Sequence, residues 1–238
     1  MNEKKHVLYQ KNYFEKNYKK TMVPRKSAYI ERQVERLIKA GVTRADRIID
    51  VGCGIGKYTL KLHEMGYQIE GLDIAEDLLE QMKRHNQTGR PLPLHCADAS
   101  NPPEHLLGQY DLAIGFFALH HMFDLAACFR GIKKLLKPNG RLLFLEPNPY
   151  NILYYLQILL TPKMTWQGDK GILDMRPSIL FPLMEEAGFL NPSVHRSGFF
   201  PPFIADLKGA IAVEKALEKI PLWSPLLPFQ IFSAKSKT

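Results

Sequence analysis

One stretch of the sequence decides the fold: Ile48-Ile49-Asp50-Val51-Gly52-Cys53-Gly54-Ile55-Gly56-Lys57. Its first four residues predict a buried strand, three glycines then alternate with other residues, and a helical pattern begins near Lys57. A strand that turns through glycines into a helix lets the backbone approach a ligand, because glycine has no Cβ and the first helical amides are unpaired donors. The stretch therefore predicts a binding site for a nucleotide-like ligand.

The spacing of the glycines separates three known loops of this kind. A phosphate-binding loop requires glycine at position 51 and a hydroxyl at position 58, where this chain has Val51 and Tyr58. A dinucleotide-binding loop requires a last glycine where Lys57 stands. The remaining pattern is Asp-x-Gly-x-Gly-x-Gly, which runs from Asp50 to Gly56.

Acidic residues follow the next two expected strands. Residues 67–72 predict a second strand that ends at Asp73, and residues 92–96 predict a third that leads to Asp98. A carboxylate at the end of the second strand is suited to accept hydrogen bonds from both hydroxyls of a ribose. Two alternatives remain open: Asp73 as the N-cap of a helix, with Glu76 completing a capping box, and Asp98 as an ordinary turn residue.

An adjacent histidine pair, His120 and His121, ends the expected fourth strand, where a substrate would meet the ligand. A histidine there is suited to act as a general base, because its ordinary pKa lies near neutrality, and His121 is slightly favoured. Glu146, at the end of the expected fifth strand, is another candidate to contact the acceptor. The alternative is that one histidine orders the loop and the other faces solvent.

Three motifs together resemble the class I S-adenosylmethionine-dependent methyltransferases, in particular the type 11 group that includes ubiquinone and menaquinone biosynthesis enzymes. They are the Asp50–Gly56 loop, the Leu-His-His sequence at 119–121 and the Leu-Lys-Pro-Asn-Gly-Arg sequence at 136–141. The resemblance implies a doubly wound, Rossmann-like α/β fold with a seven-stranded, mostly parallel sheet whose last strand is antiparallel. It also implies S-adenosyl-L-methionine as the cofactor.

The resemblance further implies a role for each cofactor-binding residue. Asp50, Gly52, Gly54 and Gly56 would hold the methionine part, and Asp73 would hold the ribose. Ile74 would lie against the adenine, Asp98 would accept from the adenine amino group, and a neighbouring backbone amide, that of Ala97, would meet the ring. The fourth strand lacks the Asn/Asp-Pro-Pro-aromatic motif of base N-methyltransferases, which argues against that reaction.

Two parts of the chain are expected: a helical N-terminal arm or lid at 1–45 and the methyltransferase domain at 46–238. Insertions at about 147–175 and 198–228 lie where the substrate lid forms in this family. They contain an apolar, helix-like stretch at 152–160 and an expected helix at 204–220, and a turn at 137–140 is expected to precede the fifth strand, 141–146. Apolar lids suggest a small hydrophobic acceptor with an oxygen or carbon nucleophile, although simple packing of a cap on the core remains an alternative.

The net charge of +8 resides entirely in residues 1–47, which hold 13 basic and 5 acidic side chains, whereas the rest of the chain holds 19 of each. We expect a solvated helical arm. The alternative functions are RNA methylation through this basic arm and a non-catalytic, cofactor-binding subunit. Nucleic acid is not the favoured partner.

Only three cysteines occur and none pairs with histidine at metal-ligand spacing, so no metal site is expected. Without a signal peptide we expect a cytoplasmic protein, with peripheral membrane contact through the lids or the arm.

Overall fold

The fold is that of a computed structural model, which describes residues 23–152, 154–155 and 166–237. Residues 1–22 of the expected N-terminal arm, and most of the helix-like stretch expected at 152–160, lie outside the described residues. Among the described helices, none is both long and apolar enough to cross a membrane.

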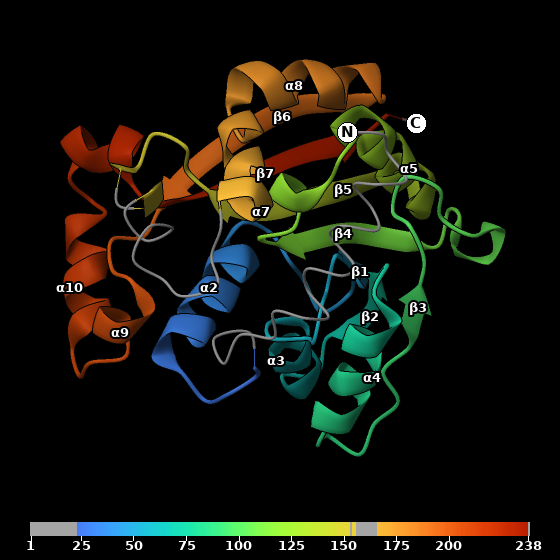
Figure 1. The fold of residues 1–238 in the computed structure, drawn as a ribbon, viewed down its shortest axis with the longest axis horizontal. Coiled ribbons are helices and arrows are strands. Elements are labelled where there is room, and N and C mark those ends of the chain that lie inside the picture. The colour runs from blue at the N-terminus through green and yellow to red at the C-terminus, as the bar shows by residue number, and fades with distance from the viewer. Residues whose placement is uncertain (1–22, 153, 156–165, 238) are drawn as a thin grey trace.

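A seven-stranded sheet crosses the molecule in the order β3-β2-β1-β4-β5-β7-β6 (Figure 1). Strands β1 to β5 pair in parallel, and β7 is antiparallel to both of its neighbours, as the sequence predicted. Because the chain leaves β1 towards β3 on one side and returns to β4 on the other, the topological switch point lies at the carboxyl ends of β1 and β4. The strands are β1 (Arg47–Val51), β2 (Gln68–Asp73), β3 (Leu94–Cys96), β4 (Tyr110–Phe116), β5 (Leu136–Pro147), β6 (Phe189–Ser197) and β7 (Phe229–Ser236).

Helices cover both faces of the sheet. Neighbouring strand residues point to opposite faces, so Ile48 packs with α2 (Ala28–Lys39) and α3 (Thr59–Glu64), whereas Ile49 packs with α5 (Leu125–Leu135) and α8 (Pro177–Glu186). The central strands β1, β4 and β5 are buried on both faces over most of their length, which explains why they are mostly apolar in sequence. The other elements are α4 (Glu76–His85), η2 (Glu104–Leu106), η3 (Leu119–His121), α7 (Trp166–Asp169), η4 (Lys170–Asp174), α9 (Pro202–Ala205), α10 (Ala210–Leu217) and η5 (Pro221–Leu226).

Two expectations about element boundaries were wrong. The turn expected at 137–140 lies within β5, because Leu136 already pairs with Tyr110 and the register then shifts before Leu112. Asn139 accommodates this irregularity with a positive φ of 60°. The single helix expected at 204–220 is divided into α9 and α10, because Gly209 adopts a φ of +84° at the break.

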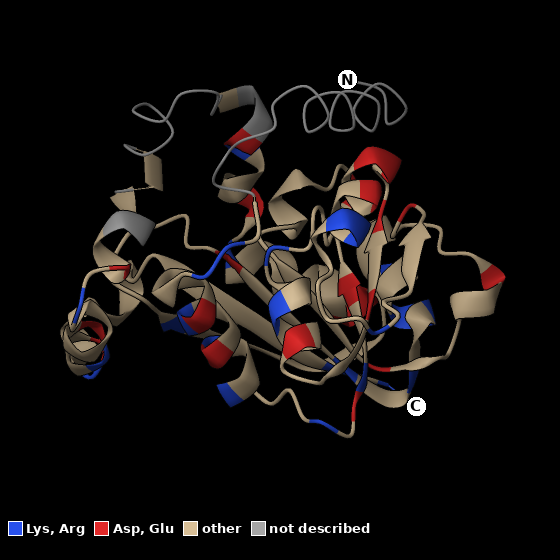
Figure 2. Cartoon of the chain, turned by 90° about the horizontal axis from the view of Figure 1, so that it is seen from below, with Lys and Arg blue, Asp and Glu red and all other residues tan. Residues whose placement is uncertain are grey.

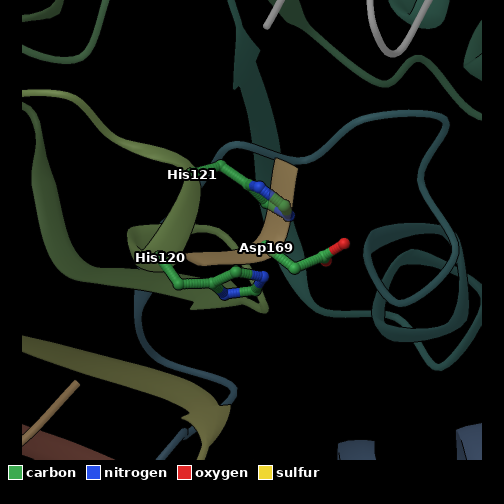
Figure 3. Close-up of side chains that lie close together, drawn as sticks. All are labelled: His120, His121 and Asp169. Atoms are coloured by element: carbon green, nitrogen blue, oxygen red, sulfur yellow. The ribbon is translucent and has the colours of Figure 1, made fainter. Parts of the chain in front are cut away.

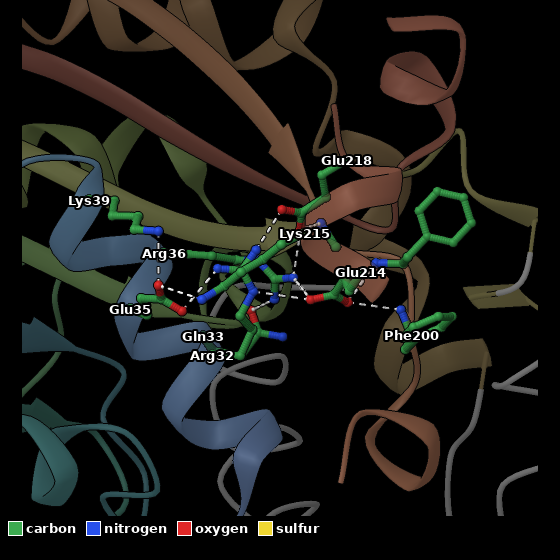
Figure 4. A network of polar contacts seen from close by, with 11 residues as sticks. Arg32, Gln33, Glu35, Arg36, Lys39, Phe200, Glu214, Lys215 and Glu218 are labelled. Atoms are coloured by element: carbon green, nitrogen blue, oxygen red, sulfur yellow. Dashed lines mark hydrogen bonds and ion pairs between the residues drawn. The ribbon is translucent and has the colours of Figure 1, made fainter. Parts of the chain in front are cut away.

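A buried ionic network joins α2 to α10 (Figure 4). Arg32 and Arg36 both donate to Glu214 Oε1, at 3.1 and 2.5 Å, and Glu218 accepts from both arginines as well. The other oxygen of Glu214 accepts the backbone amides of Phe199 and Phe200. Burial raises the pKa of Glu214, but the charge of Arg36 and these amides outweigh it, so its pKa is lowered overall. The network thus holds the second insertion against the N-terminal helix.

The basic excess of the described N-terminal segment is largely paired within the molecule. Besides the two arginines of the network, Arg25 contacts Asp206 and Arg47 contacts Glu70. Figure 2 shows basic and acidic positions interleaved over the described chain. This pairing favours a structural role for the charges of residues 25–47 over an interface with RNA.

Candidate active site

The glycine loop leaves β1 with three residues in the left-handed region. Gly52, Gly54 and Gly56 have φ values of +75°, +54° and +79°, conformations that other residues adopt only with strain. The amides of Gly52 and Cys53 donate to the carbonyl of Leu72, which attaches the loop to β2. A Cβ added to Gly54 would meet no atom of the described residues within 4 Å, so this part of the chain leaves room at Gly54.

Asp50 lies beneath this loop and is 2% exposed. Its Oδ2 accepts a 2.5 Å hydrogen bond from Thr59 in the first turn of α3, while Oδ1 is buried without a hydrogen-bond partner among the described residues. Burial raises the pKa of Asp50 to about 7, with a further increase from the nearby Asp73 carboxylate. A buried carboxylate oxygen without a donor is suited to accept a hydrogen bond from a cationic ligand.

Asp73 ends β2 as predicted and connects the loop to the strand. Its Oδ2 accepts the amide of Gly54 at 2.8 Å, and its Oδ1 accepts the amide of Ala75 at 2.9 Å. The N-cap of α4 is Ala75, so the alternative role of Asp73 as the cap in a capping box is wrong. Burial raises the pKa of Asp73, opposed by its bonds to backbone amides. Each carboxylate oxygen can accept a second bond, so both remain suitable acceptors for ribose hydroxyls. Ile74 follows and is partly buried.

Asp98 lies in the turn after β3, and the preceding Ala97 donates its amide to the carbonyl of Asp73. The amide and the hydroxyl of Ser100 both donate to Asp98 Oδ1 at 2.8 Å. The turn also packs against α5, where a Cβ added to Gly131 would lie 1.9 Å from the Ala99 carbonyl oxygen. The structure therefore brings the Asp73 and Asp98 turns together at one edge of the sheet.

The segment that carries the histidine pair packs directly on the glycine loop. A Cβ added to Gly52 would lie 2.7 Å from the Ala118 side chain and 3.6 Å from Met122. Phe117 begins the segment with a φ of +56°, an unusual conformation for an aromatic residue. Its amide is held by the carbonyl of Leu145 at 2.8 Å. The histidines are thus adjacent to the predicted methionine end of the cofactor site.

Glu146 holds His120 from inside the protein. It is fully buried, and its Oε2 lies 2.6 Å from His120 Nδ1. Its Oε1 accepts the amides of Ala118 and Leu119 at 2.8 and 2.7 Å. Because a carboxylate accepts, His120 Nδ1 donates to Glu146, and Nε2 is the nitrogen that Glu146 does not engage. Burial of both oxygens assigns Glu146 a positioning role and not the contact with the acceptor that the sequence suggested.

A residue that sequence analysis missed, Asp169, completes this region (Figure 3). It ends α7 in the first insertion, is 4% exposed, and offers an oxygen within 4.8 Å of ligand nitrogens of both His120 and His121. His121 is partly buried and its ring lies 3.9 Å, centroid to centroid, from that of His120. No local pattern around Asp169 distinguishes it from the other aspartates of the chain, since only the packing of the insertion brings it to the histidines.

Comparison with known proteins identifies the class. A family profile described as a methyltransferase domain matches residues 49–144, which include the glycine loop, both acidic turns and the histidine pair. The structure of an S-adenosylmethionine-dependent methyltransferase from Thermotoga maritima covers 96% of this chain and is itself covered completely, with a TM-score of 0.63 at 16% identity. A phosphoethanolamine N-methyltransferase from Haemonchus contortus, solved with S-adenosylmethionine, covers 87% of this chain, and 53% of its own length is matched, with a TM-score of 0.60 at 16% identity. The chain belongs to the S-adenosylmethionine-dependent methyltransferases, and S-adenosylmethionine is its cofactor.

Its curated relatives narrow the comparison. A ubiquinone biosynthesis O-methyltransferase of Bordetella parapertussis is 31% identical over 177 residues, which are 68% of this chain and 69% of the relative. The enzyme of the same name from Idiomarina loihiensis is 27% identical over 180 residues, 72% of this chain and 71% of the relative. This protein is therefore an enzyme of the type 11 group, similar to O-methyltransferases that act in ubiquinone biosynthesis.

Proposed function

We propose that this methyltransferase transfers the methyl group to a hydroxyl oxygen of a small, apolar acceptor. The observation that carries the proposal is the buried pair of Glu146 and His120, which is held against the glycine loop through Ala118. A carboxylate-oriented imidazole next to the methyl donor is suited to bind a hydroxyl and to withdraw its proton. The names of the O-methyltransferase relatives support the same chemistry.

The cofactor is proposed to bind along the edge formed by the glycine loop and the two acidic turns. Asp50 Oδ1, which lacks a donor among the described residues, would accept from the cationic amino group of the methionine part. Asp73 would accept from the ribose hydroxyls. Asp98 would receive the adenine amino group on Oδ2, since Ser100 already donates twice to Oδ1. The partly buried Ile74 and Ala97 would contact the adenine.

S-adenosylmethionine supplies an electrophilic methyl group on a positively charged sulfur. With the cofactor bound, the histidine pair would take the proton of the acceptor hydroxyl, and the freed oxygen would form its bond to the methyl carbon as the carbon–sulfur bond breaks. The electron pair of that bond would stay on sulfur, so the products would be a methyl ether, S-adenosylhomocysteine and a proton. Glu146 stabilises the orientation of His120 throughout without contacting the acceptor.

Exposed apolar side chains support an apolar acceptor. Ile152, Leu222 and Leu226 are 78%, 79% and 52% exposed. The side-chain amides of Asn148 and Asn151 donate to carbonyls of residues 225–227, so the two insertions are joined at this surface. We place the predicted peripheral membrane contact on the same surface, and binding to lipid vesicles in a sedimentation assay tests it.

The cofactor assignment is tested by pairing a protein variant with an altered ligand. S-adenosylhomocysteine and its 2′-deoxy analogue are titrated calorimetrically into the wild type and into Asp73→Ala and Asp73→Asn variants. If Asp73 binds the ribose, the wild type prefers the hydroxylated ligand by at least about tenfold, because a buried acceptor loses its partner, and both variants lose that preference. An unchanged preference in Asp73→Ala contradicts the assignment.

The reaction itself is tested by incubating the full chain with S-adenosylmethionine and hydroxylated or amine acceptors of similar apolar structure. The expected result is S-adenosylhomocysteine release that depends on a hydroxylated acceptor. We expect His121→Ala to lower the rate by roughly 100-fold or more, while cofactor affinity stays within about twofold. Release that depends on amines instead would refute oxygen as the acceptor atom.

A further inference from the structure

Three potential metal ligands converge beside the glycine loop. His120 and His121 come from η3, and Asp169 comes from α7 in the first insertion. One ligand atom from each lies within 4.8 Å of the other two (Figure 3). His120 and Asp169 are buried and His121 is partly buried, so His121 is the most accessible member of the cluster.

The cluster is supported from both sides by contacts that fix its geometry. Glu146, held by two backbone amides, contacts His120 Nδ1 at 2.6 Å, which leaves Nε2 as the nitrogen available for a ligand. A carboxylate behind a histidine in this way is the usual support of a metal-binding imidazole, since it fixes both the ring and its tautomer.

On the other side, the backbone of the first insertion packs directly on the histidine turn. A Cβ added to Gly171 would lie only 1.9 Å from the His120 carbonyl oxygen, so glycine alone allows this approach. Ile172 and Met175, which follow, are fully buried and anchor the segment. The packing of the first insertion on the histidine turn therefore helps to set the backbone position of Asp169.

We propose that His120, His121 and Asp169 bind a divalent transition-metal ion of the Zn²⁺ type, whose open coordination position receives the acceptor hydroxyl. Two imidazoles and one carboxylate suit such an ion better than Mg²⁺ or Ca²⁺, which prefer oxygen ligands. Ligand bonds of about 2.1 Å in a tetrahedral site place ligand atoms roughly 3.4 Å apart, which a small inward movement from the present separation provides. The inference goes beyond the expectation from sequence, which included no metal site.

This proposal rests on the proposed O-methylation and specifies how the hydroxyl is activated. A metal ion lowers the pKa of a bound hydroxyl, so the O–H bond breaks and the proton passes to solvent. The metal-bound oxygen then attacks the methyl carbon, and the carbon–sulfur electron pair leaves with sulfur. The histidines serve here as ligands, and the metal replaces them as the acid–base group. The substrate class becomes small hydroxylated acceptors able to coordinate a metal, such as phenols.

The test measures metal binding to the full-length protein, independently of activity. Chelator-treated, dialysed protein is titrated with Co²⁺, whose visible absorption reports nitrogen ligation, and with Zn²⁺ by calorimetry. We expect one ion per chain, and Asp169→Ala and His121→Ala should each weaken binding by more than about tenfold. Asp174→Ala, an exposed aspartate of the same insertion, is the matched control and should retain wild-type affinity. Because His120→Ala risks misfolding, Glu146→Gln serves as the additional variant, with an expected loss of about 10–100-fold.

The outcomes separate this proposal from the function on which it rests. Failure of the wild type to bind a stoichiometric ion, or unchanged affinity in Asp169→Ala, overturns the metal site. Methyl transfer to a hydroxylated acceptor that persists undiminished in chelator also overturns it while leaving the proposed function intact. Stoichiometric binding that depends on Asp169, together with transfer that is lost in chelator and restored by Zn²⁺, supports it. The same binding without transfer to any hydroxylated acceptor refutes the proposed function and leaves the metal site standing.

Discussion

The buried carboxylate of Asp50 should make the stability of this protein depend on pH in a predictable direction. Burial raises its pKa in the fold to about 7, from an ordinary value of 3.8 in the unfolded chain. Between these two values the unfolded chain has lost the proton that the folded protein still holds. The free energy of unfolding therefore falls as pH rises from about 4 to 7, and the contribution of Asp50 becomes constant above that range.

The magnitude follows from the size of the pKa difference. A shift of about three units, at about 1.36 kcal/mol for each, corresponds to roughly 4 kcal/mol of stability lost once Asp50 is ionised in the fold. Over the convenient range from pH 5 to pH 8, this linkage amounts to about 2.5 kcal/mol. An Asp50→Asn variant has no proton to lose and keeps an oxygen for the hydroxyl of Thr59, so it should not show this part of the pH dependence.

The assay is urea unfolding of both proteins at several pH values, without cofactor. The informative quantity is the difference between their unfolding free energies, because titrating groups that do not interact with Asp50 contribute equally to both. Relative to Asp50→Asn, the wild type should lose about 2.5 kcal/mol between pH 5 and pH 8. The exposed Asp77→Asn is the matched control, and its difference from the wild type should change by less than about 0.5 kcal/mol. A change of less than about 1 kcal/mol for Asp50→Asn would falsify the argument from burial.

Three further substitutions test the packing around the site. Gly131→Ala places a Cβ 1.9 Å from the Ala99 carbonyl oxygen, so it should displace the acidic turn after β3. Calorimetry should then show S-adenosylhomocysteine binding weakened by about tenfold. Unchanged affinity would contradict the contact between α5 and that turn. Glu214→Gln leaves buried arginines underpaired, so it should lower the free energy of unfolding by about 3 kcal/mol. This corresponds to a melting temperature roughly 6–12 °C lower by calorimetric scanning, and a decrease below about 2 °C would refute the network's role. Gly171→Ala forces the first insertion away from His120, so the rate of methyl transfer should fall by about 100-fold while cofactor affinity stays within about twofold. Equal losses of rate and of cofactor affinity would contradict this local effect and indicate a wider disruption.

Local patterns predicted the parts of this protein that local physics governs. The strand before Gly52, the glycine turn that follows it and the acidic residues after β2 and β3 all depend on residues close in sequence. Even the errors were local in origin: the break at Gly209 and the irregularity at Asn139 arise where one residue adopts a left-handed conformation.

The sequence by itself therefore determined the fold class, the cofactor and the placing of acidic residues directly after β2 and β3. Only the tertiary structure decided what surrounds the histidine pair. Glu146 reaches His120 because β4 and β5 are neighbours, and Asp169 reaches both histidines because Gly171 lets the first insertion pack on their backbone. These contacts join residues that no sequence periodicity relates, and their positions depend on how whole elements pack. The chemistry at the acceptor side is consequently a property of the assembled fold.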